Sequence, residues 1–342
     1  MNTTTSSHHI IHTLNFIKQD ILIYLPLIFI IVGIIGFIGN LFTFLQPTLR
    51  LNTCCIYLLC GSLVDVTNLF VNLFHVYRTP KNENILALIT SSYVCKLKLF
   101  GLVFLPQLSI NFLIVSLIDR YACTCSIKSC ISQIRRLVVA PFIICITIII
   151  SGIMSLYSPM YYDFKPGSGC TCTDPFRNGI SYIFIHGFIT PFVMLIFVLL
   201  TYRNVLVSRR RAGSKNLAKI TGSKNPFLRM VFTHVFTTSF LTLQWISFYM
   251  YHIYKKDELK TNEEITIHYF IWFISNNIYY LINVKSFYLS TLTSRSFRKT
   301  FFKSLFELLP YYQKRKKNKQ LLLNPINIPS RNKSNDIAQS DF

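Results

Sequence analysis

The sequence has 342 residues, of which 51% are hydrophobic and only 14% charged, and its formal net charge is +22 at pH 7. A soluble protein, with about 25% charged residues, would need more of them to cover its surface, so lipid is the expected solvent. The positive charge alone would allow nucleic-acid binding. That function is not expected, because the basic residues lie in loops and tails between apolar runs, the pattern of membrane topology.

Residues 1–21 are polar and are expected to form an extracellular tail. Asn2-Thr3-Thr4 is an N-glycosylation sequon, with Asn2 as the expected acceptor. No small-residue cleavage site of a secretory signal peptide follows, so the first apolar run is expected to act as an uncleaved signal anchor.

Seven apolar segments follow, at residues 22–46, 54–77, 96–121, 137–160, 180–202, 226–252 and 266–291. Each is long enough to cross ~30 Å of hydrocarbon as a helix, at ~1.5 Å per residue. Helices of this length satisfy their own backbone hydrogen bonds in lipid. The expected fold is therefore all-α, a seven-transmembrane helix bundle over residues 22–292.

The loop charges predict the orientation of this bundle. The loop between the third and fourth segments has basic residues and no acid, whereas the loop between the sixth and seventh mixes both signs. The loop between the fifth and sixth segments is also acid-free, and its basic residues are Arg203, Arg209, Arg210, Arg211, Lys215, Lys219, Lys224 and Arg229. The positive-inside rule therefore places these acid-free loops and the C-terminus in the cytosol, and the N-terminus outside the cell.

Residues 293–308 alternate apolar and basic residues at helical spacing, which predicts a short amphipathic cytosolic helix on the membrane surface. Residues 309–342 are expected to form a disordered basic cytosolic tail. Its cluster from Lys314 to Lys319 has two equally weighted interpretations: binding of anionic membrane lipid, or a solvated topology signal.

Several residues at defined depths resemble a known family. They are Gly39-Asn40 in the first segment, Ser62-Leu63-Val64-Asp65 in the second, Cys95 and Asp119-Arg120-Tyr121 at the two ends of the third, and Pro191 in the fifth. Cys95 and Arg120 are separated by 120 − 95 = 25 residues, or ~37 Å along a helix, so they belong at opposite membrane surfaces. Over about residues 22–306, the sequence resembles the rhodopsin-like (class A) G-protein-coupled receptors.

The resemblance implies a plasma-membrane receptor that transmits an extracellular signal to a cytosolic heterotrimeric G protein. Asp119, Arg120 and Tyr121 would serve coupling, and Asn40, Asp65 and Ser109 would line a sodium and water pocket or its protonated equivalent. A structural polar contact between helices is the alternative role for Asp65. The resemblance also implies a disulfide from Cys95 to a loop cysteine, either Cys170 or Cys172. No enzyme is expected, because H-E-x-x-H, G-x-S-x-G and paired intramembrane acids are absent. No cofactor is expected other than sodium at Asp65.

Candidate residues for the ligand pocket are Leu102, Pro106, His186, Gln244, Tyr249 and Tyr280. Packing is an alternative role for His186 and the aromatic residues. Leu102 stands where amine receptors carry an aspartate, so an amine ligand is not expected. Tyr280 stands where opsins carry the retinal lysine, and Lys285 lies nearer the cytosol. A peptide is the default ligand.

The sequence departs from the family in the segments that move during activation. Gln244 stands where the sixth segment carries a proline, and Ser286–Ser290 replaces Asn-Pro-x-x-Tyr in the seventh. Two alternatives therefore remain, a receptor-like protein that does not signal and a seven-helix transporter or channel. A transporter would need ionisable residues at several depths, and Asp65 is nearly alone.

The sixth segment also lacks an acid that would restrain Arg120. No Asp or Glu occurs from Pro175 to Lys256. Arg120 is then left with Asp119 as its nearby charged partner. Because that restraint is weak, high ligand-independent signalling is expected.

Overall fold

The structure is a computed structural model that describes residues 11–14, 16, 17, 22–47, 49–73, 91–125, 137–165, 169–211, 217–255 and 261–308. Side chains are described in these ranges except at positions 23, 208–228 and 308. The expected glycosylation site at Asn2 and the expected basic tail from residue 309 lie outside them.

The chain forms two compact units, Met1–Phe301 and Phe302–Phe342. The elements of the first unit begin with η2 (Leu22–Tyr24), α2 (Leu25–Phe44), α3 (Thr53–Asn68), the π-helical η3 (Leu69–Leu73), α5 (Ser92–Thr124), η5 (Leu137–Val139), α6 (Ala140–Ser155) and α7 (Tyr157–Met160). A hairpin of β1 (Tyr162–Lys165) and β2 (Gly169–Cys172) follows. The remaining elements are α8 (Pro175–Tyr182), the π-helical η6 (Ile183–Ile189), α9 (Thr190–Arg211), α10 (Leu217–Lys255) and α11 (Asn262–Thr293), and α12 (Arg295–Leu308) continues into the second unit.

Within the described residues, five helical stretches are long and apolar enough to cross a membrane: Leu25–Phe44, Thr53–Leu73, Ser92–Thr124, Leu137–Met160 and Pro175–Val207. They overlap the first five predicted segments and are compatible with an all-α fold of the membrane type. Helices α10 and α11 are as long, with 39 and 32 residues. Polar residues such as His234, Gln244 and Asn283 lower their mean hydropathy.

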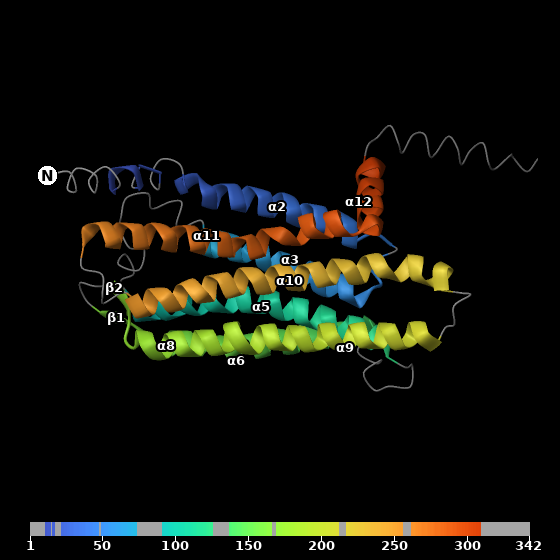
Figure 1. Ribbon diagram of the computed structural model, residues 1–342, viewed down its shortest axis with the longest axis horizontal. Helices are drawn as coiled ribbons and strands as arrows, with labels where there is room; N and C mark the ends of the chain where they lie inside the picture. Colours follow the sequence, from blue (N-terminus) through green and yellow to red (C-terminus); the bar gives the residue numbers. More distant parts are fainter. Residues whose placement is uncertain are drawn as a thin grey trace, which may run out of the picture. The chain divides into compact units, whose positions relative to one another are not determined.

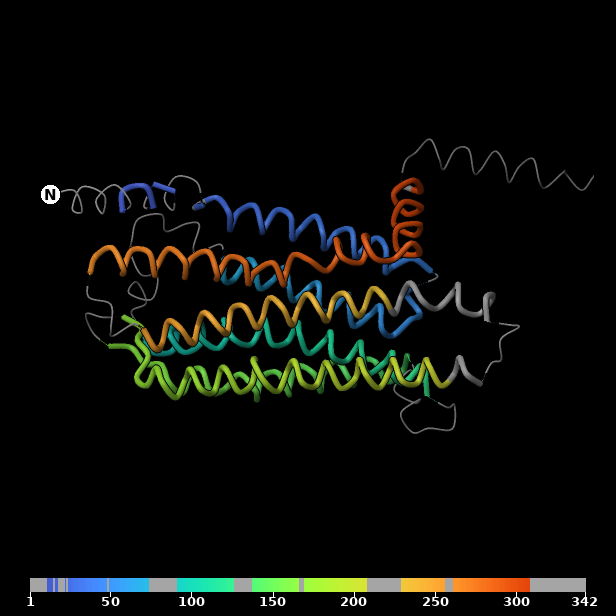
Figure 2. The backbone as a smooth tube through the Cα atoms, in the orientation of Figure 1, coloured from blue at the N-terminus to red at the C-terminus, as the bar shows by residue number. Residues whose placement is uncertain are grey.

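The long helices of the first unit run side by side (Figure 1). Helix α5 is central, because it packs against α3, α6, α9 and α10 (Figure 2). Large apolar side chains cover the exposed faces of the outer helices, among them Ile31 and Ile35 of α2, Phe142 and Ile149 of α6 and Leu195 of α9. Apolar surface on this scale is what a lipid environment requires.

Local sequence explains how several helices begin. The Asn52 side chain accepts a hydrogen bond from the backbone N–H of Cys54 and caps α3. Thr261 and Glu264 form a capping box at the start of α11. Along α6, the hydroxyl groups of Thr147 and Ser151 donate to backbone carbonyls four residues earlier, which satisfies them within an apolar helix.

Two glycines of α2 allow close helix packing. A Cβ atom at Gly39 would lie 2.4 Å from the ring of Phe287 on α11, and one at Gly33 would lie 2.4 Å from Leu69 on η3. An added methyl group at Gly39 would therefore displace the ring or the helix, whereas at Gly33 it would meet the flexible end of the Leu69 side chain. Phe287 also packs edge-on against Phe297, with ring centroids 6.0 Å apart, in an apolar cluster at the Arg120 end of the bundle.

Candidate functional site

Helix α5 carries three groups of candidate residues along its 33 residues. Cys95 lies in its first turn, Ser109 near its middle, and Asp119-Arg120-Tyr121 near its end. Each group contacts different neighbouring elements.

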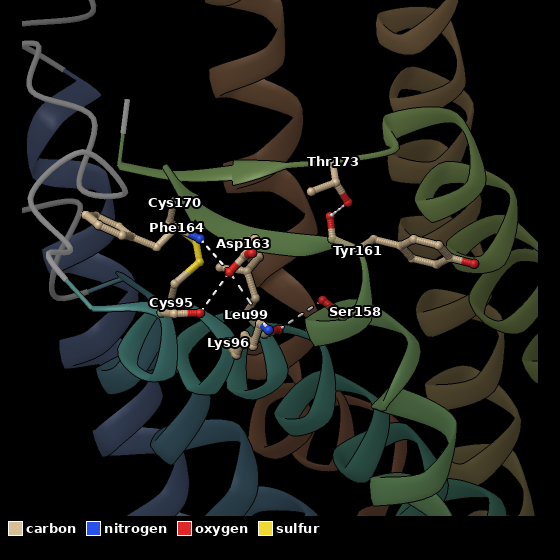
Figure 3. Close-up of a disulfide and its surroundings, with 10 residues drawn as sticks. Cys95, Lys96, Leu99, Ser158, Tyr161, Asp163, Phe164, Cys170 and Thr173 are labelled. Atoms are coloured by element: carbon tan, nitrogen blue, oxygen red, sulfur yellow. Dashed lines mark hydrogen bonds and ion pairs between the residues drawn. A yellow bond between two sulfur atoms is a disulfide. The ribbon is translucent and has the colours of Figure 1, made fainter. Parts of the chain in front are cut away.

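At the first end, a disulfide fastens the β hairpin to α5 (Figure 3). Cys95 is bonded to Cys170, with their Cα atoms 5.5 Å apart. Of the two partners that the sequence left open, the structure therefore selects Cys170. Cys172 lies two residues further along β2, opposite Tyr162 of β1.

Asp163 adds a polar attachment beside this disulfide. Its Oδ1 accepts hydrogen bonds from the Ser92 hydroxyl at 2.8 Å and the Phe164 backbone N–H at 2.9 Å, and Lys96 Nζ lies 3.9 Å away (Figure 3). The Ser92 hydroxyl, then the Phe164 N–H, and also Lys96 and Lys165 lower the pKa of this carboxyl. The hairpin is thus held to α5 by a covalent bond and by groups that favour the ionised carboxylate.

Aromatic residues from α8, α10 and α11 gather at the same end of the bundle. Trp245 Nε1 donates to the Tyr182 hydroxyl at 2.9 Å, and Tyr182 lies 5.2 Å from Tyr249, centroid to centroid. His186 stacks on Tyr182 at 4.6 Å. The His186 side chain is only 2% exposed, and neither of its ring nitrogens has a hydrogen-bond partner. These residues form an aromatic cluster with unused hydrogen-bonding capacity.

The structure does not bring all six predicted pocket residues together. His186 and Tyr249 meet through Tyr182. Tyr280 instead packs with an apolar cluster of α2, η3 and α11, and Gln244 Nε2 donates to Ser275 Oγ at 3.1 Å. Pro106 is buried inside α5, whereas Leu102 is 41% exposed. Sequence reasoning missed Tyr182 and Trp245.

Near the middle of α5, a cavity of about 30 Å³ lies among α3, α5, α10 and α11. That volume has room for about two water molecules. It is lined by Tyr57, Leu58, Gly61, Ser62, Asp65, Ser109, Ile110, Leu113, His234, Thr238, Ile282, Lys285 and Ser286. Two of the three residues predicted for a polar pocket meet here, because the Ser109 hydroxyl donates to Asp65 Oδ1 at 2.5 Å.

The third predicted residue, Asn40, does not line the cavity. Its Nδ2 donates to Ser286 Oγ at 3.3 Å. Lys285 and His234 line the cavity instead, so the expectation that Asp65 is nearly alone at this depth was wrong. Lys285 lies close enough to Asp65 to act on it electrostatically. A site that already contains an ammonium group does not fit sodium.

His234 also connects α10 to α11. Its Nε2 lies 3.0 Å from Ser290 Oγ, and both residues are buried. A buried hydrogen bond therefore joins α10 to α11.

At the far end of α5, Asp119 and Arg120 have separate polar partners at the start of α3. The Thr53 hydroxyl donates to Asp119 Oδ1 at 2.5 Å, and Arg120 Nη2 donates to Asn52 Oδ1 at 2.7 Å. Tyr121 faces α9, with its ring centroid 6.1 Å from that of Phe197. Sequence reasoning missed Asn52 and Thr53, although an Asn-Thr pair before an apolar run is a helix-start signal.

Comparison with known proteins identifies no relative. No protein-family model matches the sequence, and no curated protein matches it.

Proposed function

We propose that this chain is a seven-helix receptor of the plasma membrane that transmits an extracellular signal to a cytosolic heterotrimeric G protein. One observation carries the proposal: a single central helix, α5, bears the disulfide at Cys95, the carboxylate partner Ser109 and the charged residue Arg120 in that order. This order supports a receptor with a disulfide-stabilised loop at one membrane face, an arginine at the other and a polar contact between them.

In this proposal α10 and α11 are the sixth and seventh spans. Together with the five apolar stretches they make an odd number, which separates the two termini across the membrane. The acid-free loops then lie in the cytosol, and the N-terminus lies outside. The polar residues of α10 and α11 contact each other inside the bundle, as His234 and Ser290 do, so lipid does not have to accommodate them.

The proposed ligand site is the aromatic cluster of Tyr182, His186, Trp245 and Tyr249. Buried polar atoms are nearly always hydrogen-bonded, so the two ring nitrogens of His186 need partners. A peptide supplies backbone donors and acceptors as well as apolar surface for the tyrosine and tryptophan rings. A peptide is therefore the ligand class that suits this cluster best.

The test is G-protein activation by the full-length chain in transfected cells, measured without ligand and with a panel of peptides. Arg120→Ala should abolish the signal at matched surface expression. Arg177→Ala removes the same charge from a position that the proposal places outside the cell, and it should preserve the signal. An epitope tag inserted before Asn15 should be stained on intact cells.

A transporter or channel is the alternative that the same cells can reveal. In this chain the ionisable residues Asp65, His234 and Lys285 lie around one cavity. A permeation path would need ionisable residues at several depths. Solute or ion flux in cells that show no G-protein signal under any condition would contradict the receptor proposal.

A further inference from the structure

Groups of opposite charge line the cavity near the middle of α5. Asp65 reaches it from α3 and Lys285 from α11, and each acts electrostatically on the other. Among the described side chains, the ion pairs within 4.0 Å join other residues, so the charged atoms of Asp65 and Lys285 lie farther apart than 4.0 Å. Of the other residues that line the cavity, His234 and Tyr57 have ionisable side chains.

Lys285 is held in this position by its own helix. Its Nζ donates to the backbone carbonyl of Ile282 at 2.9 Å, one turn nearer the start of α11. Side chains on a helix incline toward its N-terminus, so the long lysine side chain runs back along α11 into the cavity. The ammonium group therefore has a fixed acceptor as well as the carboxylate across the cavity.

A sodium ion would need an uncompensated carboxylate and several oxygen ligands. The Asp65 carboxylate already has a cation within electrostatic range. Asn40 does not line the cavity, and its Nδ2 donates to Ser286 Oγ. A second cation beside Lys285 would be repelled in a medium of low dielectric constant. The charge of Lys285 therefore opposes sodium binding.

We propose that the Lys285 ammonium is the permanent counter-ion of the Asp65 carboxylate, so that this cavity holds water but binds no sodium ion. The lysine supplies from within the chain the positive charge that a bound metal ion would otherwise supply. Helices α3 and α11 are thereby connected through opposite charges that neither salt composition nor sodium concentration controls.

The first experiment measures thermal unfolding of the purified full-length protein in lipid nanodiscs. The midpoint temperature is compared in NaCl, KCl and N-methylglucamine chloride at equal ionic strength. The wild-type midpoint should be the same in all three salts. A higher midpoint in NaCl alone would overturn the proposal.

The second experiment removes the charges singly and together. Lys285→Met leaves a buried carboxylate without its counter-ion, and its midpoint in KCl should fall by roughly 5–10 °C. This variant should gain stabilisation by NaCl, because its cavity now lacks a cation. Lys285→Arg is the matched control, since it keeps the positive charge and should remain indifferent to sodium.

The double variant Asp65→Asn/Lys285→Met distinguishes a coupled pair from two independent structural residues. Loss of both charges leaves neither unpaired, so its midpoint should exceed that of Lys285→Met in KCl and should not depend on sodium. Additive losses from Asp65→Asn and Lys285→Met would overturn the proposal. The readout is stability, so the result is independent of whether the chain activates a G protein.

Discussion

Arg120 and Asn52 are joined by a hydrogen bond of 2.7 Å from the guanidinium Nη2 to the side-chain Oδ1. The same oxygen accepts the backbone N–H of Cys54 at 3.2 Å, so it also caps α3. One amide oxygen therefore connects the end of α5 with the start of α3. This contact holds Arg120 without any acid from α10.

Asn52→Ala removes both interactions and should lower the free energy of unfolding by about 1–3 kcal/mol, from one helix cap and one hydrogen bond to a charged group. If the chain is the proposed receptor, the freed arginine should also raise ligand-independent G-protein activation several-fold. Thermal unfolding and basal signalling at matched expression measure the two effects. Asn52→Asp, which keeps the acceptor and adds a negative charge, should lower the basal signal. An unchanged Asn52→Ala protein would refute the restraint.

Thr53→Val tests the neighbouring contact to Asp119. Valine keeps the shape of threonine, but it cannot donate to a carboxylate that is 0% exposed. Loss of a hydrogen bond to a buried charged group should destabilise the protein by about 1.5–3 kcal/mol. Thr53→Ser retains the hydroxyl and should unfold within about 1 kcal/mol of the wild type. Equal unfolding midpoints for the valine and serine variants would contradict this role for Thr53.

Hydropathy predicted the helices, and the resemblance to the receptor family implied that Asp65 and Ser109 would meet. Apolar runs of this length form helices in lipid whatever their partners are. Polar residues at matching depths on neighbouring helices then come together. The partners of Arg120 and Asp119 were not predicted, because Asn52 and Thr53 lie just outside the apolar segments. Counting residues along a helix does not show which residues of a neighbouring helix it contacts there.

That Lys285 lines the cavity with Asp65 was not predicted, for a different physical reason. Depth was counted along the backbone of the seventh segment, but a lysine side chain extends several ångströms toward the start of its helix. The π-helical η6 likewise shifts the helical register around His186, since a π-turn contains an extra residue. Side-chain reach and local register are not visible in a hydropathy pattern.

The disulfide leads to a prediction about single and double cysteine variants. Cys95→Ala and Cys170→Ala remove the same bond, which closes a sequence separation of 75 residues. Each should lower stability by about 2–5 kcal/mol, and the double variant should be no worse than either single variant. Cys172→Ser is the control, and it should leave the Cys95–Cys170 crosslink intact in peptide mass spectrometry. A crosslink between Cys95 and Cys172 in the wild type would show that this pairing is wrong.

Acidification should loosen the hairpin at Asp163. The folded-state pKa of this carboxyl is lowered, so its contribution is present above the pKa of the unfolded chain and is lost as the pH falls through the folded value. Amide hydrogen exchange at Phe164 should therefore be more protected at neutral pH than below the ordinary aspartate range of about 4, after correction for the intrinsic exchange rate. Asp163→Asn should show the low protection at both pH values. Equal protection of the wild-type amide across this range would exclude the carboxylate as a hairpin anchor.

Gly39 provides the sharpest test of the packing between α2 and α11. A methyl group there would lie 2.4–2.7 Å from three carbon atoms of the Phe287 ring. Gly39→Ala should therefore force the ring or the helix to move, at a cost of about 1–3 kcal/mol. At Gly101 of α5 an added Cβ meets nothing within 4 Å, so Gly101→Ala is the matched control and should not lower the unfolding midpoint. Phe287→Leu should recover part of the loss in the Gly39→Ala background, because the smaller side chain leaves room for the methyl group. If Gly39→Ala and Gly101→Ala unfold alike, the two helices do not pack as closely as the structure places them.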